Sequence, residues 1–331
     1  MENQNGNQFE DDAKLKDQRY QKLLHNFIEA SGSIALIKTL TEIPHITGDS
    51  AEEKAYGLII GKDQDVNVRV LAVQKISKVI GSNPAMITEC LDILRDEQEP
   101  SDLRHEVLNV LEALEFWSQT FKSMRPQYFE ALYELLGSPV KSLVEDATGI
   151  LAIHKDLEVQ NRLLVGLQTN TEPLVSAAKA IQLLSYDIHF NFHSTVRDIL
   201  LNPDTPDDVR VQAVHALTTD MGSKEVISSI LEDKRQSQNV RLASVAALQS
   251  AYPSEFIALG KPVVLDDSDD QEVRAASLNA LMFIRDSEQV FNDSDFVEKV
   301  NKISTPRAMG SLNKRTTDMF LEKANKFLDK K

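Results

Sequence analysis

Apolar and small residues recur along this chain in a pattern that returns every 31 to 40 residues. In the clearest copy an acidic segment leads into Val273-Arg274, and Ser277 and Leu281 follow four and eight residues after the valine. Residues at i, i+4 and i+8 share one face of a helix, and a small residue between them lets a neighbouring helix come close. The copies begin at Val68, Leu103, Leu143, Leu174, Val209, Val240 and Val273. A period of this length predicts an all-α fold, a right-handed α-solenoid of about seven helix pairs.

The segments on either side of the repeat predict caps for its two ends. We expect a disordered N-terminus at 1–12, a helical N-terminal cap at 13–50, the solenoid at 51–291 and a C-terminal helical cap with a basic tail at 292–331. Terminal helices of this kind are needed because the first and last repeats would otherwise expose an apolar face.

The repeated residues resemble the HEAT-repeat family, in a bacterial form related to phycobilin-lyase-type repeats, over roughly residues 50–290. The resemblance rests on Val-Arg or Leu-Arg pairs that follow an acidic residue, as in Asp208-Val209-Arg210. It implies that the acidic turn residue and the arginine form a ladder that fixes the stacking of neighbouring repeats. The ladder residues are Arg69, Arg104, Arg210, Arg241 and Arg274. Because Val144 and Val175 replace arginine in the two middle copies, we expect the ladder to be interrupted there.

Charge narrows the class of partner. The formal net charge is −15, and the acidic excess lies before Lys302, since the residues from Lys302 onward are net basic. An acidic body repels phosphate backbones, so nucleic acid is an unlikely partner. A single cysteine, no run of 18 apolar residues and an N-terminus without a basic or apolar signal predict a soluble, cytoplasmic protein with no membrane span.

Two histidine motifs raise the question of a metal site. His105-Glu106 is similar to the His-Glu pair with which deoxyhypusine hydroxylases, also HEAT-like, ligate two irons, but that family needs several such pairs from different repeats. The equivalent positions of the other arginine-bearing copies hold no His-Glu pair. His189 and His193 have a metal-ligand spacing only if one helix holds both, and Asn191 between them favours a connection. We therefore predict no metal.

The remaining chemical candidates also favour structural roles. The acidic run at 266–270 lacks the central glycine and the acidic twelfth position of an EF-hand, so it is better explained as a helix start. Cys90 lies among apolar residues, which indicates a buried thiol rather than a nucleophile. We predict no catalytic residue and no cofactor. Trp117, with Phe116 and Phe121, is interpreted as core packing, with a partner-binding anchor as the alternative.

These observations predict a non-catalytic protein-interaction scaffold, and not an enzyme. We expect a protein or peptide, possibly basic, to bind the concave surface lined by the second helices of the pairs. The candidate contacts on that surface are Arg69, Gln74, Gln212, His215, Gln249 and Asn279. The alternatives are a HEAT-like enzyme, of the bilin-lyase or DNA-glycosylase type, and a regulatory subunit that binds a basic partner. The sequence leaves partner identity and oligomeric state open.

Overall fold

The computed structural model describes residues 3–169, 171, 173–303 and 314–329, with side chains from residue 14 onward. Over this part of the chain the structure is 77% helix, with 20 α-helices and no strand. The predicted all-α solenoid is confirmed, while the number of repeats stays a prediction. None of the described helices is both long and apolar enough to cross a membrane.

The chain divides into two compact units, Met1–Leu151 and Ala152–Lys331. Unit 1 contains α1 (Asn3–Glu29), α2 (Ser33–Glu42), α3 (Asp49–Ile60), α4 (Val66–Lys75), α5 (Ser77–Ile80), α6 (Pro84–Arg95), α7 (Ser101–Trp117), α8 (Gln119–Leu135) and most of α9 (Lys141–Ile153). Unit 2 contains α10 (Leu157–Thr169), α11 (Ala177–Leu184), α12 (His193–Leu201), α13 (Asp207–Leu217), the 3-10 helix η1 (Met221–Ser223), α14 (Lys224–Glu232), α15 (Gln238–Ala251), α16 (Pro253–Leu265), α17 (Gln271–Phe283), α18 (Ser287–Phe291), α19 (Ser294–Ile303) and α20 (Lys314–Leu328).

Helix α1 begins inside the segment predicted to be disordered. It starts at Asn3, whereas the sequence analysis placed the first helix at residue 13; residues 1 and 2 lie outside the described part. Residues 3–12 consist largely of asparagine and aspartate with one glycine, which are weak helix formers, so propensity does not account for the extension of the helix toward the N-terminus. The boundaries proposed for the caps and the solenoid stay predictions.

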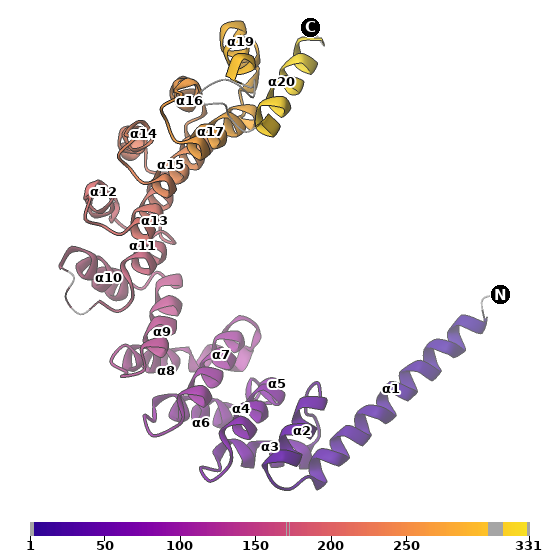
Figure 1. The fold of residues 1–331 in the computed structure, drawn as a ribbon. Helices are drawn as coiled ribbons and strands as arrows, with labels where there is room; N and C mark the ends of the chain where they lie inside the picture. Colours follow the sequence, from indigo (N-terminus) through magenta and orange to yellow (C-terminus); the bar gives the residue numbers. More distant parts are fainter. Residues whose placement is uncertain (1–2, 170, 172, 304–313, 330–331) are drawn as a thin grey trace. The chain divides into compact units, whose positions relative to one another are not determined.

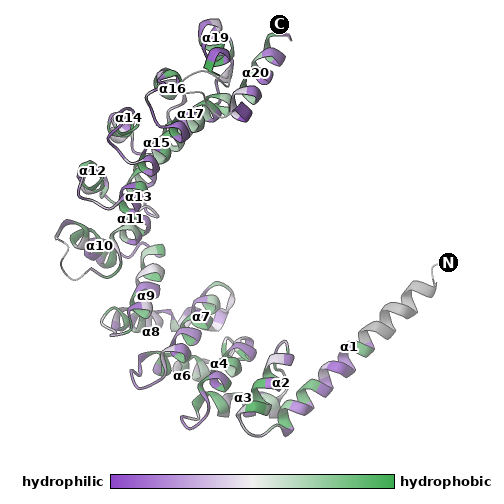
Figure 2. Ribbon diagram, in the orientation of Figure 1, coloured by the Kyte–Doolittle hydropathy of each residue, from purple (hydrophilic) through white to green (hydrophobic). Residues whose placement is uncertain are grey.

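Within each unit the helices form two rows. The first helix of a pair is called the A helix and the second the B helix. In unit 2 the B helices α11, α13, α15 and α17 pack side by side, and α10, α12, α14 and α16 form the A row (Figure 1). In unit 1, α3 pairs with α4 and α6 with α7, and α4 packs on α7. Most helices carry both hydrophobic and hydrophilic residues (Figure 2), because each buries only one stripe.

In each arginine-bearing pair the arginine of the B helix is hydrogen-bonded to the C-terminal end of its own A helix. The arginine Nε donates a hydrogen bond to the main-chain carbonyl ten residues earlier, at 2.8 to 3.1 Å. The accepting residues are Ile59, Leu94, Leu200, Leu231 and Val264, each one residue before the end of its A helix. The last carbonyls of a helix have no partner within it, and a cation is favourable there. The arginines are therefore helix caps as well as ladder residues.

The turn after each capped A helix has one shape. The C-cap residue is extended, with ψ between 99° and 116°, and its carbonyl accepts a hydrogen bond from the residue three positions later. In four of these five turns an aspartate or asparagine at the C-cap also accepts a side-chain bond from the amide two residues on, as at Asp96 and Asn202. Such Asx turns explain why acidic residues cluster between the helices.

Three arginines also reach the turn of the next pair. Arg69 Nη1 lies 2.5 Å from Glu99, and Arg241 makes two bonds to Asp269, at 2.5 and 2.8 Å. Arg210 bonds in the same way to Gln236. Each acceptor lies five residues before the next arginine in the sequence. The predicted ladder partner was the acid at the helix start, and the structure corrects this, because helix-start acids such as Asp65 and Asp270 cap their own helices.

The two middle pairs are built without the arginine. Val144 and Val175 are buried, and α8 ends through main-chain bonds from Leu136, Gly137 and Ser138 to the carbonyls three residues earlier. In the next pair the buried amide of Gln160 donates to Asp187, at 3.1 Å. Different contacts therefore close these pairs, and the division between units, after Leu151, falls between the two valines.

The C-terminal helix α20 packs on unit 2. Phe320 is fully buried between Phe291 and Phe296, with ring centroids 5.6 and 5.7 Å away. Lys323 donates to the carbonyl of Met282 at 2.8 Å, near the end of α17, and lies 3.9 Å from the centre of the Phe283 ring. The sequence left open whether this basic helix packs on the solenoid or binds a partner; in the structure an aromatic core holds it.

The buried ion pair of Arg241 generates the first prediction. We expect Arg241→Gln to lower the free energy of unfolding by about 3–5 kcal/mol, because it leaves the buried Asp269 carboxylate without its cation. The matched control is Arg235→Gln, six residues away, where the arginine is 90% exposed and solvent screening should leave the free energy of unfolding nearly unchanged. Urea unfolding followed by circular dichroism measures both. Equal losses for the two variants would contradict the capping role.

A second prediction concerns acid stability. Hydrogen bonds from Lys234 and Ser268 lower the pKa of Asp266 to about 2. A carboxyl group whose pKa is lowered by folding contributes stability above its unfolded pKa, near 4, and loses it as the pH falls toward 2. Because the Lys234–Asp266 ion pair is partly exposed, Asp266→Asn should lower the free energy of unfolding by about 1 kcal/mol or less at pH 7.

The difference between the Asp266→Asn variant and the parent should shrink as the pH falls from 5 to 3. Asparagine retains the oxygen that accepts from the Ser268 amide, so the turn itself is preserved. The neighbouring Asp267→Asn, at an exposed position, is the control. Melting temperatures across this pH range test the prediction, and a difference that stays constant with pH would refute it.

Candidate partner-binding surface

The six residues predicted to contact a partner do not share one environment. Gln74, His215 and Asn279 are exposed, and each lies five residues after the arginine of its B helix. Gln212 and Gln249 are half-buried. Arg69 is only 2% exposed, so the structure contradicts its place on an open surface. Its guanidinium bonds to the Ile59 carbonyl and to Glu99. Since these bonds hold the side chain inside the fold, Arg69 is not accessible to a partner.

Four of the predicted residues lie in unit 2, on three adjacent B helices. We call the solvent-facing side of α13, α15 and α17 the B-helix face. Its exposed or half-buried residues are Val211, Gln212, His215, Leu242, Ala246, Gln249, Ala275, Ala276, Asn279 and Phe283. Because α13 contacts α15 and α15 contacts α17, these residues form a continuous strip.

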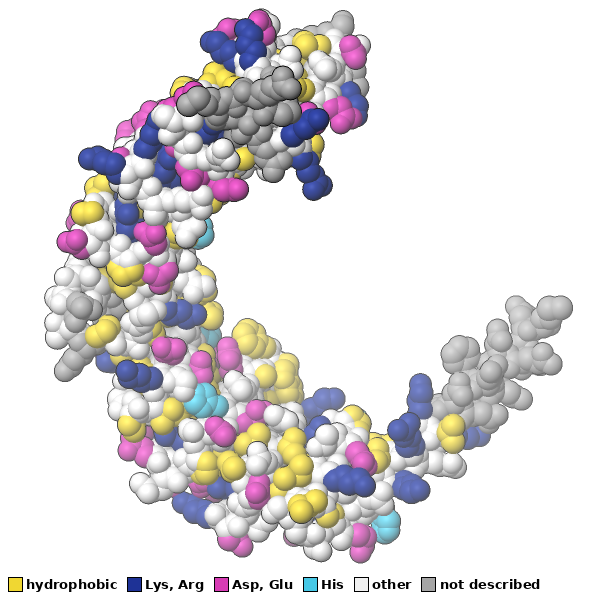
Figure 3. All heavy atoms as spheres, in the orientation of Figure 1, with side chains coloured by type: hydrophobic (Ala, Val, Ile, Leu, Met, Phe, Trp, Pro, Cys, Tyr) yellow, Lys and Arg dark blue, Asp and Glu magenta, His cyan; other side chains and the backbone are white. Residues whose placement is uncertain are grey.

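None of the ten residues of the B-helix face is charged, and at the Phe283 end Lys323 of α20 lies over the Phe283 ring. In α13, α15 and α17 the acidic residues lie in the first turn, and the remaining charges are the buried Arg210, Arg241 and Arg274. The A helices of the same unit carry charges on their solvent sides, such as Asp198, Glu225 and Glu232. Figure 3 shows acidic and basic side chains along the A row of unit 2. The net charge of the chain is therefore not a property of this face, which gives no support to a basic partner.

Polar groups on the face are amides and one imidazole. The Gln249 amide donates to the Ala280 carbonyl of the next B helix, at 3.2 Å, which fixes that side chain across two pairs. His215 and Asn279 are exposed, with Ala246 lying on the helix between theirs. Amide and imidazole groups can both donate and accept hydrogen bonds, so such a strip can pair with the main chain of a bound segment.

The aromatic cluster at the end of α7, in unit 1, is divided between core and surface. Phe121 is fully buried and packs edge-to-face on Tyr128, which confirms packing for that residue. Phe116 is 80% exposed, and Trp117 is half-exposed. Hydrophobic side chains gather over this end of α7 in Figure 3. The inner edge of the Trp117 ring lies against Gly81, where an added Cβ would be 2.7 Å from the ring.

The histidines singled out in the sequence have structural neighbours. His105 Nδ1 lies 2.8 Å from the Ser101 carbonyl, and its Nε2 is 3.6 Å from Asp146. His193 starts α12 and stacks on Phe192, whereas His189 precedes the helix. The two are thus not at i and i+4 of one helix. Among the described residues no group of three or more His, Cys, Asp or Glu side chains could hold a metal ion.

Cys90 and the acidic run at 266–270 also take structural positions. Cys90 is buried, and burial raises the pKa of its thiol to about 12, so the thiol stays protonated and unreactive at neutral pH. Asp266 closes an Asx turn, Asp269 binds Arg241, and Asp270 caps α17 through the amides of Glu272 and Val273. Each of these carboxylates is engaged by the fold.

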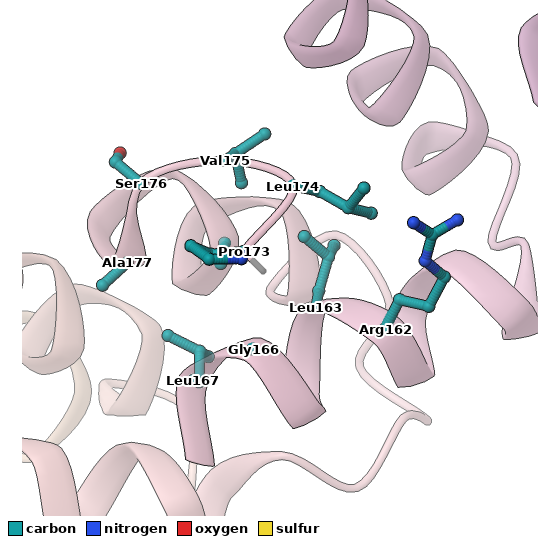
Figure 4. A pocket seen from close by; sticks show the side chains of 10 residues that line it. Arg162, Leu163, Gly166, Leu167, Pro173, Leu174, Val175, Ser176 and Ala177 are labelled. Carbon is teal, nitrogen blue, oxygen red and sulfur yellow. The ribbon is translucent and has the colours of Figure 1, made fainter. Parts of the chain in front are cut away.

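Unit 2 has several hollows that were not anticipated from the sequence, and two of them adjoin the B helices α11 and α13. One, of about 150 Å³, lies between α10 and the segment leading into α11 (Figure 4). Leu163, Leu167 and Pro173 line it, and Arg162 lies at its side. The other, of about 560 Å³, lies at the C-terminal ends of α11 and α13 and is lined by Ile188, Phe192 and Met221 among others. Loops form much of both hollows, and helical periodicity carries no signal for loop geometry.

Comparison with known proteins gives no match in sequence and weak likenesses to solved structures. No family model and no curated protein matches the chain. The solved structure of human deoxyhypusine hydroxylase in complex with glycerol is similar over 96% of this chain and 99% of that chain, at 15% identity and a TM-score of 0.31. A likeness of this strength says nothing of the activity of this chain.

The comparison does correct one expectation. The sequence analysis predicted that the chain is not an enzyme, and the similar structure is that of an enzyme. The expectation that the chain is not an enzyme is therefore contradicted by the comparison.

Gly81 and Trp117 generate a third prediction. We expect Gly81→Ala to cost about 1–3 kcal/mol, because its Cβ would lie 2.5 Å from Leu114 and 2.7 Å from Trp117. The control is Gly57→Ala in the interior of α3, where a Cβ meets nothing within 4 Å and alanine should stabilise the helix by about 0.5–1 kcal/mol. Thermal unfolding of the two variants should shift in opposite directions. A rise in melting temperature for both would show that Trp117 does not pack here.

Proposed function

We propose that unit 2 binds a segment of a partner protein along its B-helix face. The observation that supports this is a solvent-facing strip of uncharged residues across three packed helices, with Lys323 of α20 only at its Phe283 end, in a chain of which 26% of the residues are charged. A surface kept for solubility alone would mix charges of both signs. Depletion of charge at the centre, with apolar and amide groups together, is typical of protein interfaces.

The chemistry of the face defines the kind of segment it accepts. Leu242 and Phe283 offer apolar contact, and the alanines at 246, 275 and 276 let a bound chain approach the helices closely. Gln212 and Asn279 can hydrogen-bond its main chain. A charged side chain buried here would lose water without gaining a counter-ion, so the bound strip should be uncharged.

Nucleic acid fits this face poorly. Phosphate groups are bound mainly through lysine and arginine, and the arginines of these B helices are buried in the fold. Binding of a protein segment is compatible with catalysis, since a bound partner can also be a substrate. The regulatory alternative, a subunit that binds a basic partner, would need an acidic surface elsewhere on the chain.

Placing a charge at the centre of the strip tests the proposal. We expect Ala246→Glu to reduce capture of the partner at least ten-fold, because a buried carboxylate without a counter-ion costs well over 1.4 kcal/mol. The matched control is Ala258→Glu, an exposed alanine in the middle of the A helix α16, which should leave capture unchanged. Tagged full-length parent and variants are used to capture proteins from the native cell lysate, with quantitative mass spectrometry.

The informative result is the difference between the two variants. A protein retained by the parent and by Ala258→Glu, but lost with Ala246→Glu, supports the B-helix face. Equal retention by all three chains places the interaction elsewhere. Matching melting temperatures for the two variants would confirm that both are folded, and tight DNA or RNA binding by the parent with no protein recovered would overturn the proposal.

A further inference from the structure

The hollow at the ends of α11 and α13 continues the B-helix face. Thr219, which lines it, lies four residues after His215 and is exposed, so the hollow opens one helical turn beyond the strip. Its volume is about 560 Å³. The residues that line it come from the end of α13, from η1 and from the loop between α11 and α12: Ser185, Ile188, Phe192, His193, Ala216, Thr219, Asp220 and Met221.

The rim of this hollow is unusually apolar for an exposed surface. Ile188 is 73% exposed and Met221 is 76% exposed, although both are large apolar side chains. Phe192 forms a buried floor, and the His193 ring stacks on it with a centroid separation of 4.4 Å. Leaving two such side chains in water gives up free energy that an apolar occupant would recover.

The charged groups of the hollow are already satisfied by the protein. Asp220 accepts hydrogen bonds from Arg197 and Ser223, each at 2.5 Å, and its main-chain carbonyl accepts one from the Tyr252 hydroxyl at 3.0 Å. Burial alone would raise the pKa of Asp220, but the hydrogen bonds from Ser223 and from the Gly222 amide, together with the nearby His193 and Arg197, hold it below its ordinary value. The carboxylate is therefore ionised and paired at neutral pH, and it does not call for a cation from a ligand.

We infer that the hollow receives one large uncharged apolar side chain, such as phenylalanine, leucine or methionine, from the segment bound on the B-helix face. This inference rests on the proposed function and adds the chemistry of the partner: an uncharged segment with a single apolar anchor. Charge complementarity supports that occupant, because the ionic groups of the wall pair with each other and the rim is apolar. Anchor residues in pockets, surrounded by weaker contacts, are the usual arrangement of protein interfaces.

The chain offers a direct test, because its single cysteine is buried and unreactive. Thr219→Cys places a thiol at the hollow, and Ala258→Cys places one at the exposed control position on α16. Each variant carries one of three probes as a mixed disulfide with the new cysteine: 2-phenylethanethiol, cysteamine or 3-mercaptopropionate. It is then equilibrated with rising concentrations of the reductant 2-mercaptoethanol. Intact mass spectrometry measures the reductant concentration that releases half of each probe.

At Thr219→Cys we expect the phenyl probe to resist release by about ten-fold more reductant than either charged probe, as burial of most of an aromatic ring requires. At Ala258→Cys the three probes should be released alike. Adding Ile188→Ser, at a position too exposed to affect folding, should remove most of the preference. Equal release of the three probes at Thr219→Cys, or a preference for either charged probe, would overturn the anchor.

Failure here can be told apart from failure of the proposed function. If Ala246→Glu abolishes partner capture but the phenyl probe shows no preference, the face binds without this anchor, and the inference is wrong. If the phenyl preference is present and Ile188→Ser also lowers capture of the same partner, the inference is supported.

Discussion

The fold depends on one hydrogen bond, from a buried arginine Nε to the carbonyl near the end of the preceding A helix. The bond satisfies two groups that would otherwise be costly to bury, a guanidinium and an unpaired helix carbonyl. It recurs at five pairs with donor–acceptor distances that differ by only 0.3 Å, because the arginine always lies ten positions after the carbonyl residue and the turn between them has one shape. That fixed length sets where each B helix begins, and so which of its residues face the core.

The sequence carried enough to predict these helices and their repeated arginines, but neither the burial of the arginines nor the partners of the guanidinium groups. Spacing suggests the nearest acid, such as Asp65 or Asp270, yet those carboxylates are used by the amides of their own helices. The true acceptors, Glu99, Gln236 and Asp269, close the turn of the next pair. Their direction follows from the extended C-cap, a main-chain feature that hydrophobic periodicity does not encode.

For the candidate site, too, the sequence predicted which helix positions are exposed but not which way each side chain points. Periodicity located the exposed side of the B helices, so the positions of His215 and Asn279 were predictable. It could not separate Arg69 from them, because an arginine on a helix can face either the core or the solvent. Net charge also misled, since it sums residues in turns and A helices that lie away from the face. The loop-built hollow at Ile188 and Met221 left no periodic signal at all.

The arginine–carbonyl hydrogen bond also connects the distribution of charge in unit 2 with the proposed binding at the B-helix face. The acidic residues of unit 2 gather at the turns, where Asx geometry and the arginines hold them, and cross-links such as Gln238 to Asp270 add to that edge. With the register of the stack fixed there and in the core, the solvent side of α13, α15 and α17 needs no ion pairs of its own. Stability therefore places little constraint on the residues of that side. The uncharged composition of that side therefore supports the proposed contact with another chain.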